Sequence, residues 1–210
     1  MKLQRAFYDR ATLDVARDLI GQVLVHNRRG VRTSGAIVEV EAYVGESDPA
    51  CHAAPGPTRR NAPLYGPPGY AYVYLNYGIH CLVNVVTEER GSPAAVLIRA
   101  LEPREGTAVM RRRRSRVTRG RPIQPSRRLA DHELCRGPGN LTVAMGITLA
   151  ENSCDLLGDR LYIERASGPA QCLIWGPRIG ISVGTERPWR VYADGNPAVS
   201  GVPRRKGSRE

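Results

Sequence analysis

Two segments of the chain carry residue types that together could hold an organic base and attack its bond. In Ile37–Gly45, a predicted strand, the side chains of Glu39, Glu41 and Tyr43 share one face because strand residues alternate. The segment Tyr72–Gly78 carries three tyrosines and ends in a glycine turn. Aromatic rings stack on flat bases, and a carboxylate can activate a water molecule. The pairing indicates a pocket for a nucleic-acid base with an acid beside it.

The two glutamates need a neighbour of opposite charge. Like charges on one strand face repel each other unless a cation or water lies between them. Arg99, inside the apolar run Ala95–Leu101, is the candidate, since a charge in such a run is usually paired. Two other interpretations stay open: the face of Glu39 and Glu41 could be solvated, and Arg99 could form a purely structural ion pair.

The tyrosines of the second segment fall into two groups. Tyr70, Tyr72 and Tyr74 share one strand face, which core packing alone would explain because tyrosine favours strands. Tyr77 lies at the turn beside Gly78, where packing is a poor explanation for a large ring. A wedge inserted between base pairs would account for it.

Two further polar residues are candidates. Asn84 lies in an apolar strand, so it needs hydrogen-bond partners if it is buried. His52 lies in a proline-rich loop, and a lone histidine is more often structural than catalytic.

The charge of the chain limits its partners. The formal net charge is +11 and the pI is about 10.0, which favours nucleic acid or an anionic membrane. Lys2 and Lys206 are the only lysines among 31 basic residues, so 29 are arginines, and nine of these lie in 111–128. A mutational bias would explain the choice of arginine but not the surplus over 20 acids.

Cysteine usage and the N-terminus indicate a cytoplasmic protein. The five cysteines are odd in number and form no CxxC pair, which disfavours a zinc site or a disulfide framework. The first residues have no apolar signal region, and no apolar run reaches membrane-spanning length. We therefore expect reduced thiols and no membrane partner.

The pattern of short strands and few helices predicts a single α+β domain. Expected strands are 22–26, 36–44, 70–75, 79–87, 94–101, 161–164 and 179–183. Expected helices are 9–20, 103–115 and one opened by 134–141, with an irregular loop at 49–69. The basic tail 202–210 is predicted to be disordered.

The ordered set of motifs resembles the alkyladenine (3-methyladenine) DNA glycosylase family, the monofunctional alkylpurine DNA glycosylases. The matching segments are Val38–Gly45, His52, Arg60–Asn61, Gly66–Gly78, Asn84, Val96–Pro103, Leu134–Leu141 and Pro177–Val183. No single segment is specific, but their order and spacing agree over roughly residues 5–201. We expect residues 1–201 to form one glycosylase domain.

The resemblance implies a fold and a reaction. The fold is a mixed α+β domain with a curved antiparallel sheet, flanking helices and a hairpin protruding at Tyr77. The reaction releases an alkylated or deaminated purine of the 3-methyladenine, 7-methylguanine or hypoxanthine type from DNA. Glu41 would be the general base that activates water, and Arg99 and the main-chain carbonyl of Ile179 would hold that water. The family uses no metal or organic cofactor.

The resemblance also implies a base pocket. Tyr43, His52 and Tyr74 would stack on the flipped base, and the main chain around Ala50 and His52 would bond its edge. Asn84 would crowd the 2-amino group of guanine.

The partner implied is double-stranded DNA containing a damaged purine, bound by a monomer. Tyr77 would fill the gap left by the extruded nucleotide. Arg60, Arg111 and Arg112 are expected to contact the DNA backbone, and the protein to associate with the bacterial nucleoid.

The lysines add an inference that needs no family. Glycosylases that also cut the strand use an amine to form a Schiff base. Lys2 and Lys206 lie near the termini, so we predict a monofunctional enzyme. The alternatives are a non-catalytic binder of damaged DNA, a nucleoside or nucleotide hydrolase, and a basic RNA-associated protein.

Overall fold

The computed structural model describes residues 1–116, 128–167 and 171–201. Most of the arginine-rich stretch 111–128 and the whole predicted tail 202–210 lie outside the described residues. Among the described helices, none is both long and apolar enough to cross a membrane.

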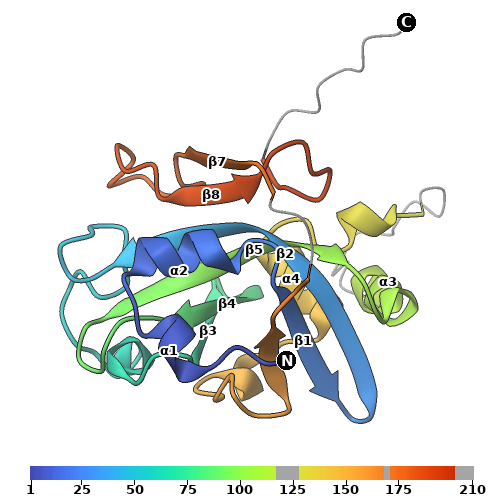
Figure 1. Cartoon of the computed structure of the whole chain (residues 1–210), viewed down its shortest axis with the longest axis horizontal. Helices are drawn as coiled ribbons and strands as arrows, with labels where there is room; N and C mark the ends of the chain where they lie inside the picture. The colour runs from blue at the N-terminus through green and yellow to red at the C-terminus, as the bar shows by residue number, and fades with distance from the viewer. Residues whose placement is uncertain (117–127, 168–170, 202–210) are drawn as a thin grey trace, which may run out of the picture.

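Within the described residues, eight strands form one antiparallel sheet. They are β1 (Val23–Arg28), β2 (Val31–Val44), β3 (Ala71–Asn76), β4 (His80–Val86), β5 (Ala94–Pro103), β6 (Leu161–Glu164), β7 (Leu173–Gly176) and β8 (Arg190–Ala193). The strand order is β3-β4-β5-β2-β1-β6, while β8 pairs with β2 and with β7. The sheet curls, and the β7–β8 pair lies beside β2, at the top of the view in Figure 1.

Short helices cover the sheet. They are α1 (Arg5–Tyr8), α2 (Thr12–Leu19), α3 (Thr107–Arg116) and α4 (Pro138–Met145), with 3-10 segments η1 (Ala62–Tyr65), η2 (Asp131–Glu133) and η3 (Leu149–Glu151). Helix α2 packs on β2 and β5, α4 on β4 and β5, and α3 on α4. The predicted α+β class, with a curved antiparallel sheet and flanking helices, is confirmed.

Strand β2 pairs with three other strands. Its residues 35–44 pair with β5 on one edge, while 31–36 pair with β1 and 39–41 with β8 on the other. Both side-chain faces around Glu39 and Glu41 are buried, and neither glutamate is exposed to solvent. The interpretation of a solvated face is therefore wrong. The N–H groups of Ile179 and Ser200 and the guanidinium of Arg190 bond to the two carboxylates and cover that face. The register against β5 shifts at Glu39, an irregularity that re-aims side chains.

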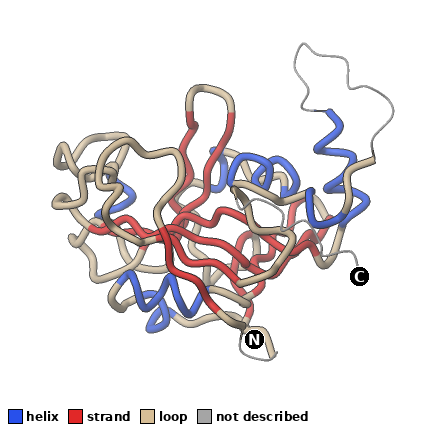
Figure 2. Tube along the Cα trace, turned by 90° about the horizontal axis from the view of Figure 1, so that it is seen from above, coloured by secondary structure: helices blue, strands red, loops and turns tan. Residues whose placement is uncertain are grey.

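The β3–β4 hairpin stands out from the body of the protein (Figure 2). Tyr77 and Gly78 have φ angles of 48° and 67°, so both central residues are left-handed, as a type I′ turn requires. The turn leaves the Tyr77 side chain 87% exposed. The predicted protruding hairpin centred on Tyr77 is confirmed.

The ends of one strand and one helix differ from the prediction. The strand predicted over 22–26 continues to Arg28, because Asn27 and Arg28 pair with the next strand, and Arg29 and Gly30 make the turn. The predicted helix 9–20 is shorter in the structure: α2 begins at Thr12 and ends at Leu19, since Ile20 is extended.

Two predicted elements were placed wrongly. The helix expected over 103–115 begins at Thr107, because Pro103 still pairs in β5 and Gly106, with φ 76°, makes the turn. Residues 179–183 are not a strand. The Ile179 N–H donates to the Glu41 carboxylate, and Gly180 has a left-handed φ of 78°, so the local strand is β7 instead.

The core should be sensitive to cavity creation on β5. Ile98 is completely buried in the main hydrophobic cluster, so Ile98→Ala should lower the free energy of unfolding by about 2–5 kcal/mol. The same change at Ile79, which is 69% exposed at the hairpin, should lower it by less than about 0.5 kcal/mol. Urea unfolding of both variants measures this, and equal losses would contradict the packing described.

Candidate active site

A cavity of about 450 Å³ opens between the β3–β4 hairpin, β5 and the segment after β7. This volume lies in the range of roughly 300–1,000 Å³ that small organic ligands occupy in proteins. The predicted site residues that line it are Tyr43, Ala50, His52, Tyr74, Tyr77, Asn84, Arg99 and Ile179. Residues from several distant parts of the chain thus meet at one place.

Glu41 lies directly behind the cavity wall. One carboxylate oxygen accepts the Ile179 N–H at 2.7 Å and lies 3.1 Å from Nη1 of Arg99. The other oxygen accepts the Tyr43 hydroxyl at 2.9 Å. All three partners line the cavity, so they connect the buried carboxylate to the space where a ligand would lie. The prediction for Ile179 concerned its carbonyl, and the contact present here is made by its N–H.

The environment of Glu41 strengthens it as a base. Burial raises the pKa of Glu41 above its ordinary value, and Arg99, the Ile179 N–H and the Tyr43 hydroxyl oppose that rise. Burial, and then the charge of Glu41, raise the pKa of Tyr43, so its hydroxyl remains a donor. A carboxylate with a raised pKa takes a proton from water more readily than an exposed one.

Aromatic side chains in contact with one another form one wall. The rings of His52 and Tyr74 lie 4.4 Å apart between centroids, and those of Tyr72 and Tyr74 lie 5.3 Å apart. Nδ1 of His52 lies 2.9 Å from the Tyr72 hydroxyl, and Asn84 donates to the Tyr72 carbonyl at 3.0 Å. Burial, and then the charge of Arg60, lower the pKa of His52, so its imidazole is neutral near neutral pH. The wall is a preformed, uncharged surface suited to a flat base.

Comparison with known proteins agrees with this geometry. The model of the family described as methylpurine-DNA glycosylase (MPG) matches residues 6–197. The chain belongs to this family. It is 47% identical over 203 residues to a "Putative 3-methyladenine DNA glycosylase" of Methanocella arvoryzae, covering 94% of this chain and 95% of the relative.

Two further relatives carry the same name. One, from Alkaliphilus oremlandii, is 44% identical and covers 95% of this chain and 99% of its own. The other, from Burkholderia lata, is 46% identical and covers 95% and 91%. The predicted resemblance is confirmed. Family membership makes this chain a DNA glycosylase of the monofunctional class that acts in base-excision repair of alkylated purines.

A buried ion pair that the sequence analysis did not predict contacts two parts of the cavity lining. The carboxylate of Asp48 and the guanidinium of Arg178 form two contacts, at 2.5 and 2.8 Å, and both side chains are buried. Arg178 also lies over the rings of Tyr43 and Trp189, at 4.7 and 5.3 Å. Asp48 accepts the Ala50 N–H at 3.2 Å. The pair therefore holds both Tyr43 and the loop at Ala50 in place. The only feature of the sequence that could have indicated it is the position of Arg178 directly before Ile179.

The predicted DNA-backbone residues lie outside the cavity lining. Arg60 is exposed, donates to the Leu75 carbonyl at 3.3 Å, and lies 5.9 Å from the Tyr74 ring centroid. Arg111 on α3 pairs with Asp131, while Arg112 is exposed. Their contacts with phosphate stay a prediction.

The described residues contain no group of three or more His, Cys, Asp or Glu side chains placed to bind a metal ion. The five cysteines, all within the described part, are free thiols.

Breaking the buried Asp48–Arg178 ion pair should destabilise the protein. Asp48→Asn leaves the Arg178 charge buried without its carboxylate, so the free energy of unfolding should fall by about 3–5 kcal/mol. The matched change Asp159→Asn removes an exposed partner of Lys2 and should leave the urea midpoint almost unchanged. Similar midpoints for the two variants would show that the Asp48 contact carries no stability.

Proposed function

We propose that this protein flips alkylated or deaminated purines of the 3-methyladenine, 7-methylguanine and hypoxanthine type out of duplex DNA. It then hydrolyses the N-glycosidic bond with water activated by Glu41 and leaves an abasic site. The observation that carries the proposal is the Glu41 carboxylate, bonded to three lining residues behind an aromatic cavity.

Base flipping accounts for the shape of the protein. An enzyme that acts on a stacked base must extrude it, which costs a few kcal/mol and least for damaged pairs. The exposed Tyr77 ring would fill the gap in the duplex, while His52, Tyr74 and Tyr43 hold the extruded base. Asn84, fixed by its bond to the Tyr72 carbonyl, would crowd the 2-amino group of guanine.

Bond cleavage follows from the charges. As the bond between C1′ and the purine nitrogen breaks, its electron pair leaves with the base and positive charge develops on the sugar. Ionised Glu41 stabilises that charge and takes a proton from the water that attacks C1′. Arg99 and the Ile179 carbonyl position this water. Cationic alkylpurines leave directly, whereas neutral hypoxanthine also requires a proton.

The lysines support hydrolysis rather than strand cleavage. Lys2 donates to the Gly158 carbonyl, pairs with Asp159 and is not a lining residue. Lys206 lies outside the described residues. No lysine lines the cavity within the described part, which supports water as the nucleophile in place of an amine.

The partner is double-stranded DNA, in keeping with the net charge of +11. Residues 1–201 form the glycosylase domain, which acts as a monomer in the cytoplasm, associated with the nucleoid. A non-catalytic binder of damaged DNA would gain nothing from Glu41 beside Arg99. A nucleoside hydrolase would not need an exposed Tyr77.

Glu41→Gln should abolish base release while leaving DNA binding intact. The amide cannot accept the proton of water, so release of hypoxanthine from a duplex with one lesion should fall by at least about 100-fold. Single-turnover assays with metal chelated, and affinity measured in parallel, test this. The control Glu102→Gln, at an exposed residue of β5, should match the wild type.

Two outcomes would contradict the proposal. Base release by Glu41→Gln at the wild-type rate would remove Glu41 from the mechanism. No release by the wild type from either a hypoxanthine duplex or methylated DNA would leave a binding protein.

The pH dependence of base release should report the raised pKa of Glu41. Glu41 must be ionised to act, so the rate should fall as the pH drops through its pKa, which lies above the ordinary 4.5. Arg99→Gln removes the charge that opposes the rise and should move this acid limb to higher pH. Single-turnover rates on a 7-methylguanine duplex measure the limb, and an unmoved limb would contradict this assignment.

A further inference from the structure

Glu39 is a second buried carboxylate beside Glu41, and both of its oxygens accept hydrogen bonds. One oxygen accepts from Nε of Arg99 and Nε of Arg190, each at 2.8 Å, and from the Ser200 hydroxyl at 3.0 Å. The other oxygen accepts the Ser200 N–H at 2.7 Å. Glu39 is unexposed and does not line the cavity, so it has no route to substrate.

Arg99 is divided between the two glutamates. Its Nε donates a hydrogen bond to Glu39, whereas only its Nη1 contacts Glu41, at 3.1 Å. Arginine prefers a two-fold contact with a single carboxylate, which both strengthens the pair and lowers the proton affinity of the acid. The Nε contact with Glu39 prevents Arg99 from turning its fork onto Glu41.

We propose that Glu39 is a positioning residue of the reaction: it holds Arg99 away from a two-fold contact with Glu41 and so preserves the strength of Glu41 as a base. This inference rests on the proposed function. Arg190 and Ser200 hold Glu39 in turn, and Arg190 also donates to the Ser200 carbonyl at 2.7 Å. Two carboxylates and two guanidiniums balance, so the buried cluster is neutral.

The charges around Glu41 give the sign of the effect. The ionisable groups that face it are Glu39 and Tyr43 on β2, Tyr74 on β3, Arg99 on β5, Arg178 after β7 and Arg190, opposite Glu41 in the β2–β8 register. The negative charge of Glu39 is among the causes that raise the pKa of Glu41. Losing that charge therefore lowers the pKa, and it leaves Arg99 with Glu41 as its nearest carboxylate.

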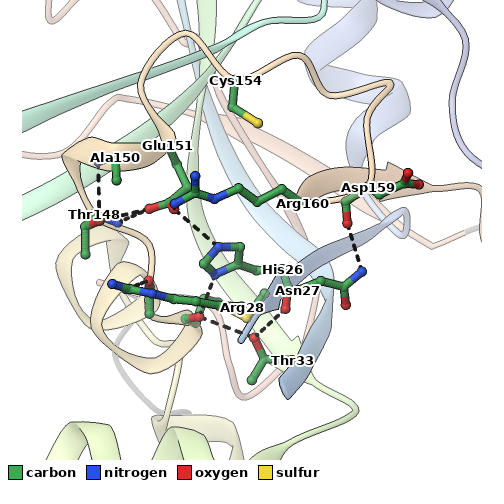
Figure 3. Close-up of polar contacts among 12 residues, drawn as sticks. His26, Asn27, Arg28, Thr33, Thr148, Ala150, Glu151, Cys154, Asp159 and Arg160 are labelled. Atoms are coloured by element: carbon green, nitrogen blue, oxygen red, sulfur yellow. Dashed lines mark hydrogen bonds and ion pairs between the residues drawn. The ribbon is translucent and has the colours of Figure 1, made fainter. Parts of the chain in front are cut away.

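A matched buried glutamate separates this role from general folding effects. Glu151 is equally unexposed, bonds to the Thr148 N–H and hydroxyl, pairs with Arg160, and lies 3.6 Å from Nε2 of His26 (Figure 3). It does not line the cavity and does not contact Arg99. Glu151→Gln thus removes a buried charge of the same kind at a distinct place.

The test compares Glu39→Gln, Glu39→Asp and Glu151→Gln on the 7-methylguanine duplex across pH. Glu39→Gln should lower the single-turnover rate about 100-fold near neutral pH, move the acid limb to lower pH, and keep DNA affinity unchanged. Glu39→Asp keeps the charge but draws it back from Arg99, so the limb should stay at its wild-type position with about a tenfold loss of rate. Glu151→Gln should change neither quantity.

Several results would overturn the proposal. These are a wild-type rate and limb in Glu39→Gln, a limb moved to higher pH, or an equal loss in Glu151→Gln. If Glu39→Gln does not fold, Glu39→Asp decides, and a wild-type rate in that variant rejects the positioning role. Failure of the proposed function is distinct, because it would appear as no base release by the wild type.

Discussion

The site depends on the contact of the Arg99 guanidinium with two buried carboxylates. Two glutamates this close and this deeply buried would not both stay ionised without compensating cations, because desolvation disfavours the charged form. Arg99 supplies one cation and Arg190 the other. The carboxylates come from β2 and the cations from β5 and β8. The order of strands around β2 is therefore a requirement of the chemistry as well as of the packing.

This requirement gives a role to the C-terminal part of the chain. The β7–β8 pair lies on the edge of β2, and the segments around it deliver the Ile179 N–H, Arg178 and Arg190 to the site. The Ile179 N–H and Arg190 contact carboxylates of β2. Arg178 contacts the carboxylate of Asp48, in the loop after β2. Without them, Glu41 would have an unsatisfied oxygen in a buried position, which costs about 1–3 kcal/mol or more. The site is thus completed by residues remote in sequence.

The cavity lining combines a rigid aromatic wall with an exposed hairpin tip. The aromatic wall is fixed by hydrogen bonds and ring contacts, so little order is lost when a flat base enters. The hairpin presents Tyr77 to solvent at a left-handed backbone position, which only the paired strands below it maintain. A ring that is 87% exposed is suited to packing inside a duplex.

The sequence by itself determined the α+β class, the strand that carries Glu41 and the hairpin tip at Tyr77. With the family resemblance, it also named eight of the 18 residues that line the cavity. Alternation along β2 and the type I′ turn are local properties, so they are legible in a few consecutive residues. The family resemblance placed Ile179 at the same site as Glu41, which local patterns do not predict, but it concerned the Ile179 carbonyl and not the N–H that contacts Glu41. Segment ends were less certain, as the turn at Gly106 and the loop after β7 show.

Only the tertiary structure decided the burial of Glu39 and Glu41 and their partners other than Arg99, as well as the pairing of Asp48 with Arg178. Asp48 and Arg178 lie 130 residues apart, and Arg190 lies 151 residues from Glu39. A solvated strand face and a buried ionic cluster have the same sequence pattern. The difference is whether remote segments pack on that face, as those that carry Ile179, Arg190 and Ser200 do here, and no local spacing records it.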